Sequence, residues 1–135
     1  MRSVVADASA LVEYLIGSAR GARVAPIVED SAVDLHTPAL CDVEVVSALR
    51  GLIRGREIDI ARALQVLEDY ADLPLSRHGH VPLMSRSLEL RDNFSAYDAA
   101  YVALAEALSA ELLTSDARLE SAVARHAPSV HIAGT

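Results

Sequence analysis

The chain has 135 residues, which is the length of one ordinary domain. A formal charge of −7 argues against non-specific nucleic-acid binding through basic patches, although a nuclease that carries its positive charge as metal stays compatible. All 12 basic residues are Arg, so chemistry that requires a lysine, such as a phosphate-loop lysine or a Schiff base, is excluded.

In the first half of the chain, short apolar runs alternate with segments of helical periodicity. The predicted elements are a strand at 4–6, a helix that ends at Gly17, a helix at about 19–29, a strand at 33–37 and a helix from 39 to about 54. Gly17 and Gly55 supply helix ends, and Pro38 stops the second strand.

The second half continues the alternation. The predicted elements are a helix capped by Asp59 with core positions up to Tyr70, an edge strand at 73–75, helices at 83–90 and 95–108, a strand at 111–114, a helix at 117–125 and a last strand at 130–132. This order predicts an α/β fold with a small, mainly parallel sheet that is flanked by helices on both faces.

The hydrophobic fraction of 52% exceeds what a core of this size needs, so we expect apolar surface to be buried against a partner. The single cysteine, Cys41, cannot form an intrachain disulfide, which favours a reducing compartment. The N-terminal apolar run is too short for a signal peptide, and no segment approaches the roughly 20 apolar residues of a membrane span. We therefore predict a cytoplasmic protein without membrane contact.

Two acidic residues follow predicted strands. Asp7 comes directly after the first strand, and Asp116 lies two residues after the strand that ends near Thr114. Ligands of parallel sheets bind beyond the carboxyl ends of the strands, so both side chains reach the same edge if these strands are neighbours. The structural alternative is that each aspartate caps the helix that follows it.

Two more acidic residues lie on the inner faces of predicted helices. Glu44 has Leu40 and Ala48 one turn away, and Asp98 has Phe94 and Val102 one turn away. A carboxylate among apolar residues is costly unless it is neutralised. The alternatives are an arginine partner for Glu44 and a capping box in which Ser95 pairs with Asp98.

A shared divalent metal would neutralise all four carboxylates at once. Oxygen-only ligand sets suit Mg²⁺ or Mn²⁺, and such a site fits metal-assisted hydrolysis of a phosphodiester. The five histidines show no metal-ligand spacing; His78 and His80 come nearest, and we interpret them as surface or loop residues.

Four stretches in this order resemble the PIN-domain ribonucleases, specifically the VapC-type toxins of bacterial and archaeal toxin–antitoxin pairs. They are VADAS at 5–9, Glu44 with SAL at 47–49, SAYDAAYVALA at 95–105 and LLTSDARL at 112–119. The last two are the most specific, and the set covers nearly the whole chain. The resemblance implies a single PIN-like domain over residues 1–135.

The resemblance also implies an activity. Such proteins are endoribonucleases dependent on Mg²⁺ or Mn²⁺ that cut structured cellular RNA, either tRNA or rRNA, and inhibit translation. Asp7, Glu44 and Asp98 would hold the metal and position or activate the water, with Asp116 as the more variable fourth acid. Ser9 and Thr114 match small hydroxyl positions that support the acids. None of the acidic positions is substituted, so we expect an active enzyme.

Partners follow from the same resemblance. VapC-type toxins form homodimers and are neutralised by a VapB-type antitoxin, whose tail covers the acidic groove, often with an arginine. Contacts to RNA would then need local positive charge, for which Arg77, Arg86 and Arg91 are the candidates. The alternative for these three is that they are ordinary solvated surface arginines.

Two other classes of protein each require one residue that this chain lacks. A receiver domain would need an active-site lysine, which this chain lacks. A haloacid-dehalogenase-like phosphatase would need a second aspartate at the position of Ser9. Two alternatives stay open, namely a PIN nuclease of RNA maturation that has no antitoxin and a non-catalytic module whose acids dock a partner's arginine.

Overall fold

Four short strands form one parallel sheet at the centre of the molecule. The computed structural model describes residues 1–134. The strands are β1 (Arg2–Ala6), β2 (Val33–Pro38), β3 (Leu75–His78) and β4 (Glu111–Leu113). Their spatial order is β3-β2-β1-β4, and each of the three pairings is parallel. The predicted α/β fold with a parallel sheet is therefore confirmed.

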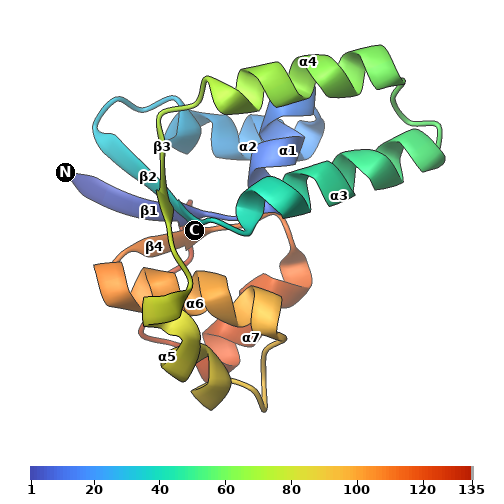
Figure 1. Cartoon of the computed structure of the whole chain (residues 1–135). Helices are drawn as coiled ribbons and strands as arrows, with labels where there is room; N and C mark the ends of the chain where they lie inside the picture. Colours follow the sequence, from blue (N-terminus) through green and yellow to red (C-terminus); the bar gives the residue numbers. More distant parts are fainter. Residues whose placement is uncertain (135) are drawn as a thin grey trace.

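Helices cover both faces of this sheet, as predicted. The helices are α1 (Ala8–Ile16), α2 (Ala19–Val28), α3 (Cys41–Arg54), α4 (Ile60–Ala71), α5 (Met84–Glu89), α6 (Ala96–Leu108) and α7 (Ala117–His126). Figure 1 shows α1 to α4 on one side of the sheet and α5 to α7 on the other. None of the helices among residues 1–134 has the length and apolar character needed to cross a membrane.

The core is built on β1 and α6. Val4, Val5 and Ala6 are fully buried because β1 is paired on both edges and covered on both faces. Every residue of α6 from Ala99 to Ala105 is also buried, since this helix packs against β1 and β2. Small alanines on α6 allow that close packing, so the helix that carries Asp98 is firmly anchored.

The first two helices are joined by a tight contact that requires glycine. Helix α1 ends at Gly17, which adopts the left-handed conformation with φ of 73°. In α2, a Cβ atom built on Gly21 would lie 2.0 Å from the carbonyl oxygen of Glu13. The absence of a side chain at Gly21 is therefore what lets α2 pack on α1.

Three predicted elements differ from the structure. The strand predicted at 73–75 is wrong, because β3 begins only at Leu75 and continues to His78. The strand predicted at 130–132 is wrong as well, since Ile132 makes only an isolated bridge with Leu112. The helix predicted at 83–90 is a 3₁₀ turn at Val81–Leu83 followed by the short α5.

Candidate active site

Four acidic side chains from distant parts of the sequence line one pocket. Strands β1 and β4 are parallel neighbours, so Asp7 and Asp116 emerge at the same edge of the sheet. Helix α3 brings Glu44 and helix α6 brings Asp98 to this edge. All four residues line a pocket of about 300 Å³ together with Ser9 and Tyr101. The strand adjacency on which the sequence argument depended is confirmed.

Asp7 is the most deeply buried of the four acids, with 5% of its surface exposed. Its Oδ1 accepts hydrogen bonds from the Ser9 hydroxyl at 2.7 Å and from the backbone N–H of Ala10 at 2.9 Å. Its Oδ2 accepts from the Thr114 hydroxyl at 2.5 Å. Burial nevertheless raises the pKa of Asp7 to about 6, with the nearby charge of Asp116 acting in the same direction.

The hydroxyls of Ser9 and Thr114 join the two loops that carry Asp7 and Asp116. The backbone N–H of Ser115 donates to Ser9 Oγ at 3.0 Å, and the N–H of Asp116 donates to Thr114 Oγ1 at 3.0 Å. The two hydroxyl oxygens lie 3.3 Å apart. A continuous hydrogen-bond network therefore fixes the end of β1 against the end of β4.

Asp7 and Asp116 also cap helices, so their structural and site roles coincide. Asp7 is the N-cap of α1 through the contact with Ala10, and Asp116 is the N-cap of α7. Oδ1 of Asp116 accepts from the backbone N–H groups of Arg118 at 2.9 Å and Leu119 at 3.3 Å. The cap fixes each carboxylate relative to its helix.

Glu44 is held by a buried tyrosine. The Tyr101 hydroxyl donates to Glu44 Oε1 at 2.6 Å, and the Tyr101 side chain is almost entirely buried. Burial raises the pKa of Glu44; the hydrogen bond from Tyr101 lowers it, and the charge of Asp98 raises it further. The partner of Glu44 is thus a hydroxyl rather than the arginine that the structural alternative required.

Asp98 lies in the first turn of α6 and faces an arginine. The backbone N–H of Asp98 donates to Ser95 Oγ at 3.1 Å, which is the capping contact expected from the sequence. Arg118 approaches Asp98 at 4.0 Å and Asp116 at 3.8 Å, but 82% of its side chain is exposed. Burial raises the pKa of Asp98; Arg118 lowers it, and Asp116 raises it. The arginine therefore neutralises the acids only weakly.

The residues of the pocket fit a hard divalent cation. The lining side chains offer carboxylate and hydroxyl oxygens and no nitrogen or sulfur ligand. Within residues 1–134, no three His, Cys, Asp or Glu side chains already form a compact ligand group. The carboxylates of Asp7, Glu44 and Asp116 accept hydrogen bonds from protein donors, as Glu44 does from Tyr101. Burial, and to a smaller extent the neighbouring carboxylates, raises the pKa values of Asp7, Glu44 and Asp98, and a bound cation would stabilise their charged forms.

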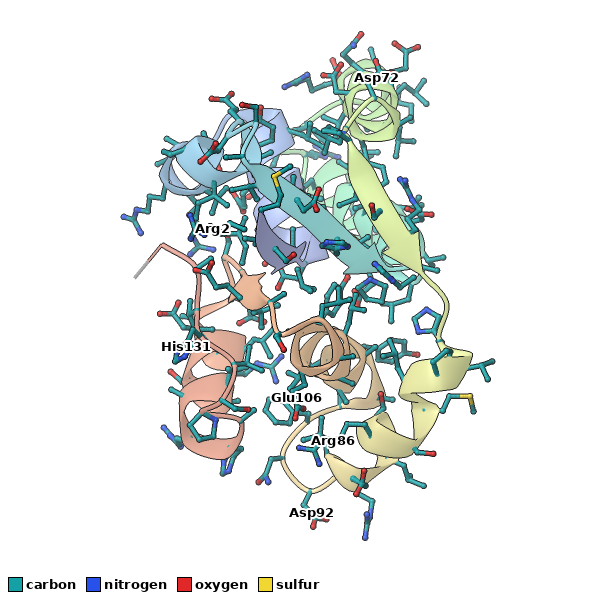
Figure 2. The ribbon with its side chains drawn as sticks, turned by 90° about the vertical axis from the view of Figure 1, so that its left-hand side faces the viewer. Arg2, Asp72, Arg86, Asp92, Glu106 and His131 are labelled. Carbon is teal, nitrogen blue, oxygen red and sulfur yellow. The ribbon has the colours of Figure 1, made fainter. Side chains whose placement is uncertain are left out.

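The three arginines predicted to contact RNA lie outside this pocket and have partners within the chain. Arg77 donates to Asp42 at 2.8 Å. Arg86 pairs with Glu106 at 3.1 Å, and Figure 2 shows the two side chains close together. The guanidinium of Arg91 donates to the carbonyl oxygen of Leu88 at 3.2 Å. Their contribution to RNA binding stays a prediction.

His78 and His80 lie at the edge of the sheet and in the loop that follows it. His78 lies in β3, where its Nε2 is 3.0 Å from Nδ1 of His36 on the neighbouring strand. His80 accepts a hydrogen bond from the backbone N–H of Leu40 at 3.0 Å. Both residues are partly exposed; His80 lies in a loop, as predicted, whereas His78 is the last residue of the edge strand β3.

An apolar groove lies beside the acidic pocket. It has a volume of about 630 Å³. Apolar side chains from the 3₁₀ turn at Val81–Leu83, from α5, from α6 and from the turn between the two helices dominate its lining, among them Leu83, Met84, Leu88, Phe94, Tyr97 and Ala100. Three of these, Met84, Leu88 and Tyr97, have more than half of their surface exposed.

Two residues of the site had no role assigned from the sequence. Tyr101 and Arg118 both lie in the stretches that resemble PIN domains, but only the acids and hydroxyls there were singled out. Tyr101 follows Asp98 by three residues, which places the two on one helix face. Arg118 follows Asp116 by two residues at the start of α7. Both residues could have been identified from the sequence by their close spacing to an acidic candidate, Asp98 for Tyr101 and Asp116 for Arg118.

The fold and the acidic pocket define a class of protein. The family model of the PIN domain matches residues 4–124, and the chain belongs to this family.

Within that family its relatives are ribonucleases of the VapC type. Ribonuclease VapC9 of Mycobacterium tuberculosis is 39% identical over 116 residues, covering 86% of this chain and 87% of the relative. Ribonuclease VapC3 of the same organism is 38% identical over 136 residues, covering 97% and 92%.

Solved structures show the same fold. The crystal structure of PAE2754 from Pyrobaculum aerophilum superposes with a TM-score of 0.68 at 23% identity, covering 90% of this chain and 79% of that one. The structure of Mycobacterium tuberculosis VapC20, described as a toxin that cleaves the sarcin-ricin loop, gives a TM-score of 0.66 at 14% identity, covering 88% and 94%.

Proposed function

We propose that this chain is a metal-dependent endoribonuclease that acts as the toxin of a toxin–antitoxin pair and inhibits translation by cutting RNA. One observation carries the proposal. Four carboxylates from the end of β1, from α3, from α6 and from the start of α7 line a single pocket in a chain that belongs to the VapC ribonucleases.

The contacts support the residue roles that the family resemblance implies. Asp7, Glu44 and Asp98 would hold the cation, with Asp116 as the fourth acid. A cation bound there would lower the pKa of a coordinated water and offset negative charge on the phosphate. Ser9 and Thr114 orient the carboxylate of Asp7, and Tyr101 orients that of Glu44. Oxygen-only ligands favour Mg²⁺ or Mn²⁺ over softer metals.

The substrate class is a structured RNA, either tRNA or rRNA. The description of VapC20 as a sarcin-ricin-loop-cleaving toxin supports a structured loop as the target of this fold. Single-stranded loops are also the part of a folded RNA that a protein pocket can enter, because their bases and backbone are not locked in a duplex.

Two protein partners belong to the proposal. A VapB-type antitoxin would cover the acidic pocket, and the approach of Arg118 to Asp98 and Asp116 supports recognition of a guanidinium there. A homodimer is supported by the apolar groove between α5 and α6, where Met84, Leu88 and Tyr97 are exposed, because contiguous exposed apolar side chains mark interaction surfaces. A single domain over residues 1–135 is supported by one core cluster that runs from Val4 to Ala133. Cytoplasmic location stays a prediction.

Two other functions would use the same acidic pocket. A PIN nuclease of RNA maturation would have the same pocket but no antitoxin gene beside its own. A non-catalytic docking module would bind a partner's arginine through the acids and would bind no metal. The contact of Arg118 with two of the acids is the observation that keeps this second function in view.

Cleavage of total cellular RNA tests the proposal directly. Wild-type protein free of antitoxin would be compared with Asp7→Asn and Asp98→Asn in Mg²⁺, Mn²⁺ or EDTA. We expect discrete fragments that require metal and are lost in both variants. If the folded wild-type protein cuts no RNA with either metal, the nuclease function is rejected and the docking-module function is favoured.

A further inference from the structure

Two arginines near the acidic pocket differ from the other candidates for RNA contact. Arg77 and Arg86 are neutralised by Asp42 and Glu106. Arg91 has no ion pair within residues 1–134 either, but it donates to the carbonyl oxygen of Leu88 and lies outside both the acidic pocket and the cleft between α2 and α7. Arg20 and Arg23 of α2, by contrast, form no ion pair within residues 1–134, and both are exposed. Their positive charge is therefore available to a ligand.

Arg20 and Arg23 line a cleft of about 300 Å³ between α2 and the start of α7. They are three residues apart, so they lie on the same face of α2. The opposite wall includes Thr114 and Ser115. Figure 2 shows α2 and α7 on the same side of the molecule, above and below the C-terminal segment.

The cleft and the acidic pocket share a wall. Thr114 lines the cleft, and its hydroxyl donates to Asp7 inside the pocket. Ser115 lines the cleft as well, and its backbone N–H donates to Ser9, which lines the pocket. A strand of RNA that leaves the acidic pocket past these residues therefore reaches the two arginines.

The negative charge of the molecule favours an additional cationic contact to RNA. The chain carries a net charge of −7, and the pocket concentrates four carboxylates where a polyanion has to bind. Guanidinium groups are well matched to phosphate, because their donors form paired hydrogen bonds with its oxygens. One acid, Glu120, also lines the cleft and opposes the arginines.

We propose that the cleft between α2 and α7 binds a backbone phosphate of the RNA that flanks the cleaved bond, with Arg20 and Arg23 as its positioning residues. This inference rests on the proposed ribonuclease function and adds a subsite to it. The cleft lies away from the reacting atoms, so it holds the substrate and the transition state equally. Removal of the two guanidinium groups should raise KM and leave kcat nearly unchanged.

The test compares two double variants with the same change in charge. Arg20→Gln/Arg23→Gln removes the proposed phosphate-binding groups. Arg54→Gln/Arg125→Gln is the control, because these two arginines are exposed and line neither the cleft nor the pocket. Steady-state cleavage of one RNA substrate would be measured for each protein at a fixed metal concentration and several salt concentrations.

The expected result is a KM about 10-fold higher for the Arg20→Gln/Arg23→Gln protein, with kcat within about twofold of the wild type. The slope of log KM against log salt should fall by about 0.7 for each phosphate that the variant no longer binds. The control should match the wild type in both quantities. Glu120→Gln removes the opposing charge and should lower KM by about twofold.

Two failures are distinguishable. Cleavage by the wild type with the same KM and salt slope in both double variants would overturn the subsite and leave the ribonuclease function intact. A wild-type protein that neither cleaves RNA nor binds it would overturn both. RNA binding by Asp98→Asn protein in EDTA provides the second measurement, since it does not depend on turnover.

Discussion

The acidic pocket and the apolar groove lie next to each other and share α6, yet each is unfavourable in a different way. The pocket removes charged groups from water, whereas the groove leaves apolar groups in water. Asp98 and Tyr101 of α6 line the pocket, where carboxylates are crowded and partly removed from water. Tyr97 and Ala100 line the groove, where large apolar side chains remain in water. One helix thus presents a charged site on one face and an uncovered apolar surface on the next.

The difference shows how each region is maintained. The pocket is held by many short hydrogen bonds, because an ionised carboxylate that is removed from water must be satisfied by donors. The groove needs no such network, since exposed apolar atoms leave no donor or acceptor unsatisfied. Mutations should therefore change folding stability in the pocket and association in the groove.

The largest effect on stability is expected for Thr114→Val. Thr114 is 8% exposed; its hydroxyl donates to Asp7 and accepts from the backbone N–H of Asp116. Valine keeps the shape of the side chain but leaves the Asp7 carboxylate and the backbone N–H of Asp116 without this partner. The free energy of unfolding should therefore fall by about 2–3 kcal/mol. Urea denaturation in EDTA would measure it. Thr114→Ser, which retains the hydroxyl, is the control, and equal stability of all three proteins would refute the role of the network.

Asp7→Asn should change stability in the opposite direction. The pKa of Asp7 is raised from 3.8 to about 6 in the folded protein, so the folded state holds its proton more tightly than the unfolded state does. This favours folding below pH 4 and is lost as the pH rises through 6. Asparagine carries no charge, so at pH 7.5 in EDTA the variant should gain about 1–2 kcal/mol.

Thermal unfolding of wild type and Asp7→Asn between pH 4 and 8 would measure this. The gain should shrink toward pH 4, where the wild-type carboxyl is already neutral. A variant that is less stable than the wild type at pH 7.5 would show that its hydrogen bonds outweigh the cost of burying the charge.

Two tyrosines on carboxylates of α3 give a matched pair. Tyr101 donates to Glu44 at 2.6 Å inside the pocket, and Tyr70 donates to Asp42 at 2.6 Å outside it. Each change to Phe should lower the free energy of unfolding by about 1 kcal/mol. Only Tyr101→Phe should slow RNA cleavage, by about 10-fold, because Glu44 loses its orientation. Equal activity of the two variants would mean that Glu44 is positioned without the tyrosine.

The smallest effect on folding is expected in the groove. Leu88→Arg changes a side chain that is 66% exposed, so the free energy of unfolding should move by less than about 0.5 kcal/mol. It should nevertheless reduce self-association, measured by sedimentation. Leu64→Arg on α4 is the control, because Leu64 is 55% exposed and lies outside the groove. If the wild type is monomeric at every concentration, the groove is not a surface for self-association.

Much of the site could be predicted because its acids obey local rules. Asp7 directly follows an apolar run, and the inward face of Glu44 follows from helical spacing of its neighbours. The meeting of Asp7 and Asp116 needed only one further fact, that β1 and β4 are neighbours. The resemblance to PIN domains supplied the same four residues independently.

The parts that were missed depend on contacts across the fold. Strand β3 carries Ser76, Arg77 and His78, a polar run without alternation, so only its pairing with β2 reveals it as a strand. Pro74 lacks an N–H and lies before the strand rather than within it. The pair of His36 with His78 and the contact of Arg118 with Asp98 likewise join elements that are distant in sequence.

The double duty of Asp7 and Asp116 as helix caps has a genetic consequence. Asparagine caps helices about as well as aspartate does, so either position tolerates the exchange without loss of its helix. Aspartate and asparagine codons differ by one base. If the two acids have the catalytic roles proposed above, a lineage in which the toxin became a burden would thus reach a folded but inactive form in a single mutational step. If the antitoxin recognises the rest of the toxin surface, the inactive form would still bind antitoxin. Active copies of the toxin in the same cell would then be left without antitoxin.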